Sequence, residues 1–266
     1  MLCDFHLHTE FSGDSETPVE DQVERAIALG MEEICITDHH DYDALEGGET
    51  FLLDVSSYLP ALERVRAAYA NRIQVRTGVE LGLQLHIQNY LEDLVSSLSV
   101  DYIIGSNHFV DGKDPYFPAF FENCTQQEAY AHYFEVTLNR IRRLQCFDVL
   151  GHLDYVVRYG PHKNRDYSFP AYREYIDPIL KCLIDHGKGL ECNTGGFKAG
   201  LGHPHPTEEI LVRYRQLGGE ILTVGSDAHT PAYVGYEFDR IQKLLRACGF
   251  RYYTVFHQRK PVFLPL

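Results

Sequence analysis

The sequence lacks the features that mark membrane, secreted and disulfide-stabilised proteins. None of its apolar runs approaches the roughly 20 residues of a membrane-spanning helix, and no cleavable signal is recognised at its start. Its seven cysteines are scattered and form no Cys-x-x-Cys pair, which excludes zinc-ribbon sites and makes disulfides unexpected. We therefore expect a cytoplasmic protein.

Basic residues are also few. The 266 residues include 24 Lys and Arg against 38 Asp and Glu, which gives a formal net charge of −14. This charge argues against nonspecific binding to nucleic acid or to anionic membranes, because both need a basic face. It does not exclude an anionic small molecule, provided that bound cations invert the local field.

No internal repeat, low-complexity tract or Pro/Ser-rich linker interrupts the chain, so a single domain is expected over residues 1–266. Short apolar runs predict strands near 2–6, 33–37, 73–79, 101–105, 147–151, 188–192 and 220–225. Helical patterns lie between them, near 17–30, 55–70, 88–98, 125–145, 170–186, 206–217 and 232–248. This alternation predicts parallel strands with helices outside, in either a doubly wound sheet or an α/β barrel.

Polar residues follow every predicted strand. The first strand ends in His6-Leu7-His8, and alternation along a strand points both imidazoles to one side. The strand ends carry, in chain order, His6 with His8, His39, Glu80, His108, His152, Asn193, and Asp227 with His229. An open sheet would not bring all seven ends together, whereas a closed barrel would, so the barrel is favoured.

This set has the composition of a metal centre. With Asp14 from a nearby turn it holds six imidazoles and three carboxylates: His6, His8, Asp14, His39, Glu80, His108, His152, Asp227 and His229. Nitrogen and oxygen ligands without thiolate suit zinc, manganese or iron. Nine ligands fit two or three ions, and Glu80 is the candidate for the bridging carboxylate that holds cations about 3.5–4 Å apart.

Six ordered motifs resemble the polymerase and histidinol phosphatase (PHP) superfamily. They are Asp-Phe-His-Leu-His (4–8), Ile-Thr-Asp-His (36–39), Gly-Val-Glu (78–80), Gly-Ser-Asn-His (105–108), Gly-His (151–152) and Gly-Ser-Asp-Ala-His (225–229). The resemblance implies an α/β fold, a distorted seven-stranded (β/α)7 barrel that is TIM-like, with a trinuclear site. It assigns His6, His8, Glu80 and Asp227 to one ion, Glu80, His108 and His152 to a second, and Asp14, His39 and His229 to a third.

Within the superfamily, four stretches resemble the stand-alone histidinol-phosphate phosphatases: 105–112, 147–159, 191–202 and 255–261. This similarity implies a phosphoric monoester hydrolase that converts L-histidinol phosphate to L-histidinol and phosphate in histidine biosynthesis, by attack of a metal-bridging hydroxide. One departure concerns the turn after Asn193. The family usually has Arg-Lys there, and this chain has Lys198-Ala199, which keeps a positive charge but loses the bidentate fork of arginine.

Three residues are predicted to contact the substrate: Arg158, Asn193 and Lys198. Arg158 lies six residues after His152 and is expected to bind the phosphate, so it joins Glu80 and Asp227 as a catalytic residue. The alternative is an ordinary loop arginine. Whether Glu191 and Asp154 support the site is open at this stage.

Other histidines and aromatics have plainer interpretations. His40 adjoins His39, but alternation points it elsewhere. His203-Pro204-His205 lies in a proline-containing loop without strand geometry, so we do not expect it to bind metal. The aromatic stretch 116–121 is too irregular for a helix and forms either a lid over the site or part of the core.

Two other functions compete with phosphomonoester hydrolysis. A PHP-type nuclease or nucleotide phosphoesterase acting on nucleic-acid ends would keep the same metal barrel, but the acidic charge and the lack of a basic, aromatic groove disfavour it. A non-catalytic metal-binding or partner-binding barrel would show degraded ligands, and none is missing. The expected partner is therefore a small phosphate monoester, with neither nucleic acid nor membrane.

Overall fold

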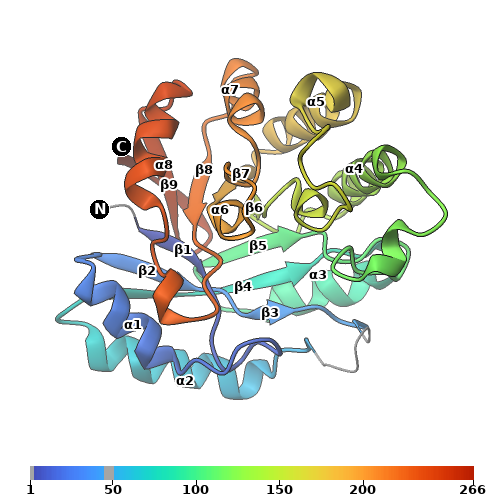
Figure 1. Cartoon of the computed structure of the whole chain (residues 1–266). Helices are drawn as coiled ribbons and strands as arrows, with labels where there is room; N and C mark the ends of the chain where they lie inside the picture. Colours follow the sequence, from blue (N-terminus) through green and yellow to red (C-terminus); the bar gives the residue numbers. More distant parts are fainter. Residues whose placement is uncertain (1–2, 45–50) are drawn as a thin grey trace.

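Parallel strands form a nearly closed barrel at the centre of the molecule (Figure 1). The structure, a computed structural model, describes residues 3–44 and 51–266. The strands follow one another around the barrel in the order β1 (Asp4–Leu7), β2 (Glu33–Ile36), β4 (Gln74–Gly82), β5 (Tyr102–Ser106), β6 (Val149–Leu150), β7 (Gly189–Asn193) and β8 (Leu222–Gly225). A two-residue strand, β3 (His39–His40), pairs in parallel with the end of β4. The predicted TIM-like α/β barrel is confirmed.

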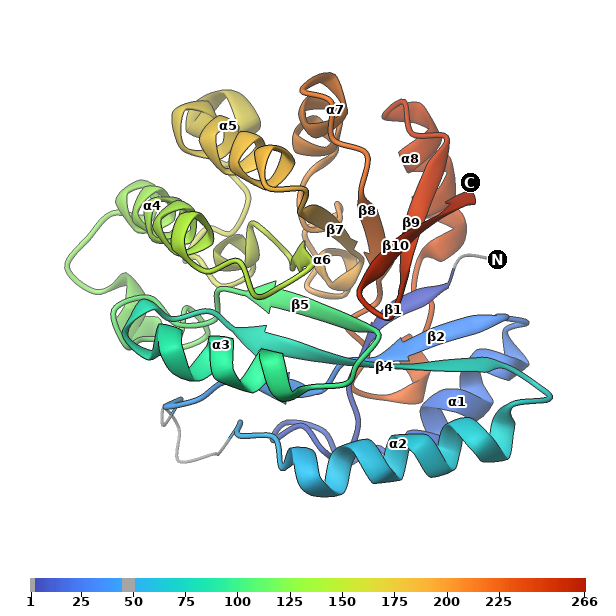
Figure 2. The same cartoon turned by 180° about the vertical axis from the view of Figure 1, so that it is seen from behind.

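Helices cover the outside of the barrel (Figures 1 and 2). They are α1 (Val19–Ala28), α2 (Val55–Tyr69), α3 (Gln88–Ser97), α4 (Gln126–Arg143), α5 (Phe169–Asp185), α7 (Glu208–Gln216) and α8 (Phe238–Ala247). Each falls within a few residues of a predicted helix. Because these helices shield the outer face while the barrel packs its own interior, every residue of β1, β2, β5, β7 and β8 is buried. None of the described helices is long and apolar enough to cross a membrane.

Short helical turns lie in the loops between these elements. They are η2 (Leu85–Ile87), η3 (Pro118–Phe121), η4 (Tyr155–Arg158), η5 (Pro231–Tyr233) and the four-residue helix α6 (Gly195–Lys198). The aromatic stretch 116–121 therefore contains one helical turn, η3, where irregular chain was expected. Three of these turns, η3, η4 and α6, follow strands β5, β6 and β7 and lie in the loops around the site described below.

The barrel closes between β1 and the segment that follows β8. Leu7 and Ala228 form a parallel bridge, in which the His8 amide donates to the Ala228 carbonyl at 3.0 Å. One residue earlier, the Asp227 amide donates to the His6 carbonyl at 2.9 Å. This seam places the first and last sequence motifs side by side.

The seam is reinforced from outside by Gln22 of α1, whose side chain is fully buried. Its amide nitrogen donates to the His8 carbonyl at 2.7 Å and to the Ala228 carbonyl at 2.8 Å. One side chain therefore ties the first helix to both edges of the seam.

A C-terminal hairpin of β9 (Tyr252–His257) and β10 (Lys260–Pro265) covers the end of the barrel at which the parallel strands begin (Figure 2). This hairpin was absent from the sequence prediction. Arg259 in its turn donates from Nε to Asp148 Oδ2 at 2.5 Å and from its backbone amide to the Asp101 carbonyl at 2.8 Å. His257 lies 2.7 Å from Glu33. The three acidic residues lie at the N-terminal ends of strands, whereas the predicted ligand motifs lie at the C-terminal ends.

Replacing Gln22 by leucine should lower the free energy of unfolding by about 1–3 kcal/mol, because the His8 carbonyl would lose its donor inside the protein. Urea unfolding of the purified variant measures this change. Gln88→Leu is the control, since the Gln88 amide donates to Glu92 on the surface of its own helix. Equal stabilities of the two variants would contradict a role for Gln22 in holding the seam.

Candidate metal centre

A cavity of about 540 Å³ opens at the C-terminal ends of the barrel strands. Half of its lining is polar and consists of Asp14, His39, His108, His152, Arg158, Asp227 and His229. The rest is largely aromatic and consists of Phe51, Phe109, Asp114, Tyr116, Phe117, Tyr155 and Tyr159. The stretch 116–121 thus divides its residues, because Tyr116 and Phe117 line the cavity whereas Phe120 and Phe121 pack against the core.

Glu80, near the end of β4, is completely buried and lies among the polar side chains of the site. Imidazole nitrogens surround both of its carboxylate oxygens. Oε2 lies 3.0 Å from His39 Nδ1, 3.2 Å from His6 Nε2 and 3.4 Å from His8 Nε2. Oε1 lies 2.9 Å from His152 Nε2 and 3.2 Å from His108 Nε2. A carboxylate with five imidazoles around its two oxygens is well placed to bridge cations.

Asp227 and Asp14 extend the cluster toward solvent. Asp227 Oδ1 lies 3.4 Å from His8 Nε2. Asp14 Oδ2 lies 3.0 Å from His229 Nε2 and 3.8 Å from His39 Nε2. All nine residues predicted as ligands therefore gather in one place.

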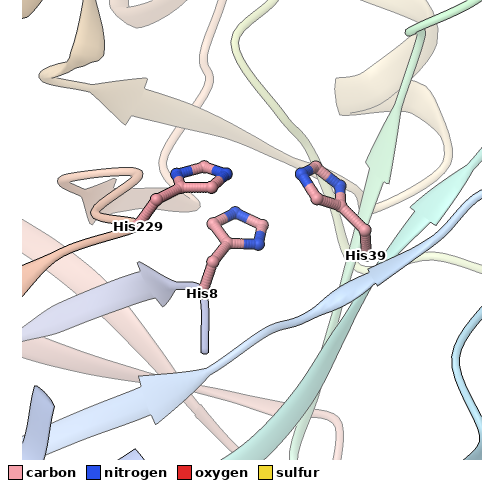
Figure 3. Close-up of side chains that lie close together, drawn as sticks. All are labelled: His8, His39 and His229. Atoms are coloured by element: carbon pink, nitrogen blue, oxygen red, sulfur yellow. The ribbon is translucent and has the colours of Figure 1, made fainter. Parts of the chain in front are cut away.

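Three of the rings form a stack at the mouth of this cluster (Figure 3). His8 lies between His39 and His229, with ring centroids 4.2 and 4.1 Å away. Nitrogens of these three rings lie within 4.8 Å of one another, as do ligand atoms of His6, His8 and Glu80 and those of Glu80, His108 and His152. The cluster thus offers several overlapping groups of three ligands.

Four imidazoles are oriented from behind through Nδ1. His6 Nδ1 lies 2.6 Å from Glu191, and His108 Nδ1 lies 3.0 Å from Asp41. The other two contacts are His8 Nδ1 with Ser12 Oγ and His229 Nδ1 with the Asp227 carbonyl, both at 3.0 Å. A proton on Nδ1 in each case leaves the Nε2 lone pair facing the cluster, which is the arrangement of metal-binding histidines.

Buried polar atoms without hydrogen bonds test whether these residues fit a metal. They include Nε2 of His6, His8 and His229, Nδ1 of His39 and Oε2 of Glu80. A buried group left unsatisfied costs about 1–3 kcal/mol, so several in one place are costly unless something else binds them. Divalent cations with nitrogen and oxygen preference would satisfy all of them, and the donor set fits such ions.

The electrostatics of the cluster keep its carboxylates charged. Burial lowers the pKa of His6 and His108, but neighbouring carboxylates outweigh it and raise both well above the usual value. The positive charges of these two rings in turn outweigh the burial of Glu80 and hold its pKa well below the usual range. Bound cations would replace the protons on the two rings.

The pKa of Asp227 is also held well below its usual range, because His8 and His6 outweigh the effect of its burial. Burial lowers the pKa of His8, and His229 lowers it further, which favours a neutral ring able to donate its lone pair.

In the last motif, Gly-Ser-Asp-Ala-His (225–229), the backbone at Gly225 passes very close to His6. A Cβ there would lie 2.3 Å from the His6 Cβ, so only glycine lets the two segments meet. Asp227 then takes a left-handed backbone conformation, with φ of 57°, which aspartate tolerates better than most residues. The Asp4 carboxylate holds this turn by accepting from the amides of Ser226 and Gly235, both at 2.9 Å.

Two carboxylates support the ligands: Asp41, which was not identified from the sequence, and Glu191, whose role the sequence left open. Asp41 follows His39 by two positions and Glu191 precedes Asn193 by two, so alternation along extended chain was the available signal. Glu191 also accepts from the His152 amide at 2.8 Å, which links two of the ligand-bearing strand ends. His40 points away, as predicted, and bonds to Tyr90.

The three predicted substrate contacts lie in different surroundings. Arg158 lines the cavity, with Nη2 3.3 Å from Asp227 Oδ2. Lys198 lines an adjoining recess with Lys163, and its ammonium lies 4.3 Å from the Tyr233 ring centroid. Asn193 is fully buried, bonds to Glu191 and the Gly195 amide, and lies outside both cavity linings, so the structure gives it a supporting position.

Replacing Glu191 by glutamine should weaken zinc binding by about 10- to 100-fold, because the group that fixes the His6 tautomer would lose its charge. Titration against a competing chelator measures this affinity. Glu220→Gln serves as a control, since Glu220 pairs with Arg215 on the surface. Equal zinc affinity in both variants would show that Glu191 does not orient a ligand.

Comparison with known proteins places these features in a family. The PHP domain model matches residues 4–195. Histidinol-phosphatase of Lactococcus lactis is 30% identical over 258 residues, which cover 97% of this chain and 95% of that protein. A probable histidinol-phosphatase of Thermotoga maritima is 31% identical over 255 residues, covering 96% and 95%.

Solved structures agree with these matches. The L. lactis histidinol phosphate phosphatase, solved with zinc, L-histidinol and phosphate, superposes with a TM-score of 0.92 at 29% identity and covers 98% of both chains. A putative histidinol phosphatase from Listeria monocytogenes shares the fold, with a TM-score of 0.76 at 20% identity, covering 90% of this chain and 99% of the other. The chain belongs to the PHP domain family.

Proposed function

We propose that this protein is a metal-dependent histidinol-phosphatase that hydrolyses L-histidinol phosphate to L-histidinol and phosphate. The observation that carries the proposal is the gathering of nine nitrogen- and oxygen-bearing side chains, with Glu80 in contact with five imidazoles among them, beside Arg158 and a group of aromatic rings. Full-length similarity to a phosphatase solved with zinc, histidinol and phosphate supports it.

The proposed ligand sets are those that the family resemblance implies, and the distances are compatible with them. His6, His8, Glu80 and Asp227 would hold one divalent ion, and Glu80, His108 and His152 a second. Asp14, His39 and His229 would hold a third, at the exposed edge of the cluster. Zinc, iron and manganese all suit such ligands. When bound, these ions supply Lewis-acid stabilisation of phosphoryl charge and lower the pKa of water.

Arg158 would bind the phosphoryl group from the protein side. Burial lowers the pKa of its guanidinium, but Tyr159 and Asp227 raise it above the usual value, so the charge is retained. The guanidinium carbon lies 5.3 Å from the Tyr155 ring centroid and 5.9 Å from that of Tyr159, which restricts its movement. A fixed cation beside the metal cluster stabilises charge that develops on phosphoryl oxygens.

The aromatic part of the lining would receive the organic part of the substrate. Rings of Tyr116, Phe117 and Tyr155 offer flat faces to an imidazole, and Asp114 adds a negative charge among them. A cavity of about 540 Å³ also has the size of a small-molecule site. Cationic, flat leaving groups therefore match this part of the lining better than long polyanions do.

A substrate panel on metal-loaded and chelator-treated protein tests the proposal. Histidinol phosphate should be hydrolysed with a kcat/KM at least about 100-fold above that for oligonucleotide ends, and chelation should abolish turnover. Released phosphate is the measurement. Preference for oligonucleotides would support a nuclease instead, and absence of any phosphoester turnover would support a non-catalytic barrel.

Replacing Arg158 by alanine should lower kcat/KM by about 100-fold or more, because it removes a charge that contacts the phosphoryl oxygens. Metal content, measured by emission spectrometry, should be unchanged. Arg165→Ala is the matched control, since Arg165 lies exposed on the same loop. Unchanged kinetics in Arg158→Ala would remove Arg158 from the site.

A further inference from the structure

His205 lies directly behind Arg158 and is completely buried. Its Nε2 is 3.4 Å from Arg158 Nε, and its Nδ1 is 2.5 Å from Asp154 Oδ1. Asp154 is also fully buried, just before the helical turn η4 that carries Arg158. This loop histidine, which was not expected to bind metal, thus joins a buried carboxylate to the arginine in the cavity.

The backbone around His205 holds the ring in place. His205 forms an antiparallel bridge with Asn193 at the end of β7, with both amide-to-carbonyl distances at 2.8 Å. Gly195 then leaves room for the arginine, because a Cβ there would lie 2.8 Å from Arg158 Nη2. The position of the imidazole is therefore fixed by the barrel itself.

The hydrogen-bonding capacity of each group sets the tautomer. A guanidinium can only donate, so the His205 Nε2 beside Arg158 must accept. The ring proton then sits on Nδ1 and is donated to Asp154. Burial lowers the pKa of His205 to about 4 even though Asp154 opposes the shift, which agrees with a neutral ring.

Arg158 has a second acceptor, but that one is shared. Asp227 Oδ2 lies 3.3 Å from Nη2, and Asp227 is also a proposed metal ligand whose charge would be drawn toward an ion. His205 faces no such competition, because its other nitrogen is committed to Asp154. It is therefore an acceptor that can hold the guanidinium whether or not the cluster is loaded.

We propose that Asp154 and His205 form a positioning pair that fixes the tautomer of His205 and so aims Arg158 at the phosphoryl group of the substrate. The inference rests on the proposed function, in which Arg158 binds phosphate. Neither residue contacts the substrate, so both act through Arg158. A purely structural buried pair would instead affect folding stability alone.

Two substitutions of His205 separate the ends of its ring. His205→Gln places an amide near the former Nε2, where its oxygen can accept from Arg158, whereas His205→Asn reaches only as far as Nδ1. Affinity for inorganic phosphate, measured by calorimetry on zinc-loaded protein, should fall about tenfold in His205→Asn and recover largely in His205→Gln. Asp154→Asn should also weaken binding, because an amide allows the opposite tautomer. His203→Gln, two residues away, should leave the affinity unchanged.

A double-mutant cycle tests whether the effect passes through Arg158. In an Arg158→Ala background, adding His205→Asn should change phosphate affinity by less than about twofold. Independent, additive losses would overturn the proposal, as would equal losses in His205→Asn and His205→Gln. If wild-type protein binds phosphate with this pattern but does not hydrolyse histidinol phosphate, the proposed function fails and the positioning pair stands.

Discussion

Closure of the barrel at one seam is the constraint on which the metal centre depends. The parallel bridge between Leu7 and Ala228 joins β1 to the segment after β8. It places His6 and His8 beside Asp227, and His8 also beside His229. A slip of one residue along this seam would turn these side chains to the other face. Gly225 and the buried Asp4 carboxylate then set the turn that presents Asp227. The metal centre therefore depends on the register in which these two segments pair.

The concentration of charge in the cluster explains how an acidic protein can accept an anion. Glu80 and Asp227 are buried and ionised, and divalent ions bound between them and the imidazoles would leave a local excess of positive charge. Arg158 adds to that excess at the cavity wall. The net charge of −14 sums over the whole chain and says little about this enclosed field.

Sequence patterns predicted the barrel and the ligand set because both depend on local periodicity and on one rule, that parallel strands end at a common rim. The predicted segment 33–37 became Glu33–Ile36, and all nine predicted ligands lie together. Asp41 carried the same two-residue signal but was passed over, and the role of Glu191 was left open. The hairpin of β9 and β10 was missed because its short strands follow the last helix, outside the strand–helix alternation.

His205 shows what periodicity cannot supply. Proline-flanked loop residues give no strand geometry, and only the tertiary pairing with Asn193 brings the ring to Arg158.

Anomalous diffraction at the zinc edge from zinc-loaded crystals would test whether Glu80 bridges divalent ions within this set of side chains. We expect at least two peaks, each about 2.0–2.2 Å from a Glu80 oxygen and from the nitrogens of the flanking histidines. Peaks confined to other parts of the molecule, or none within bonding distance of Glu80, would contradict it.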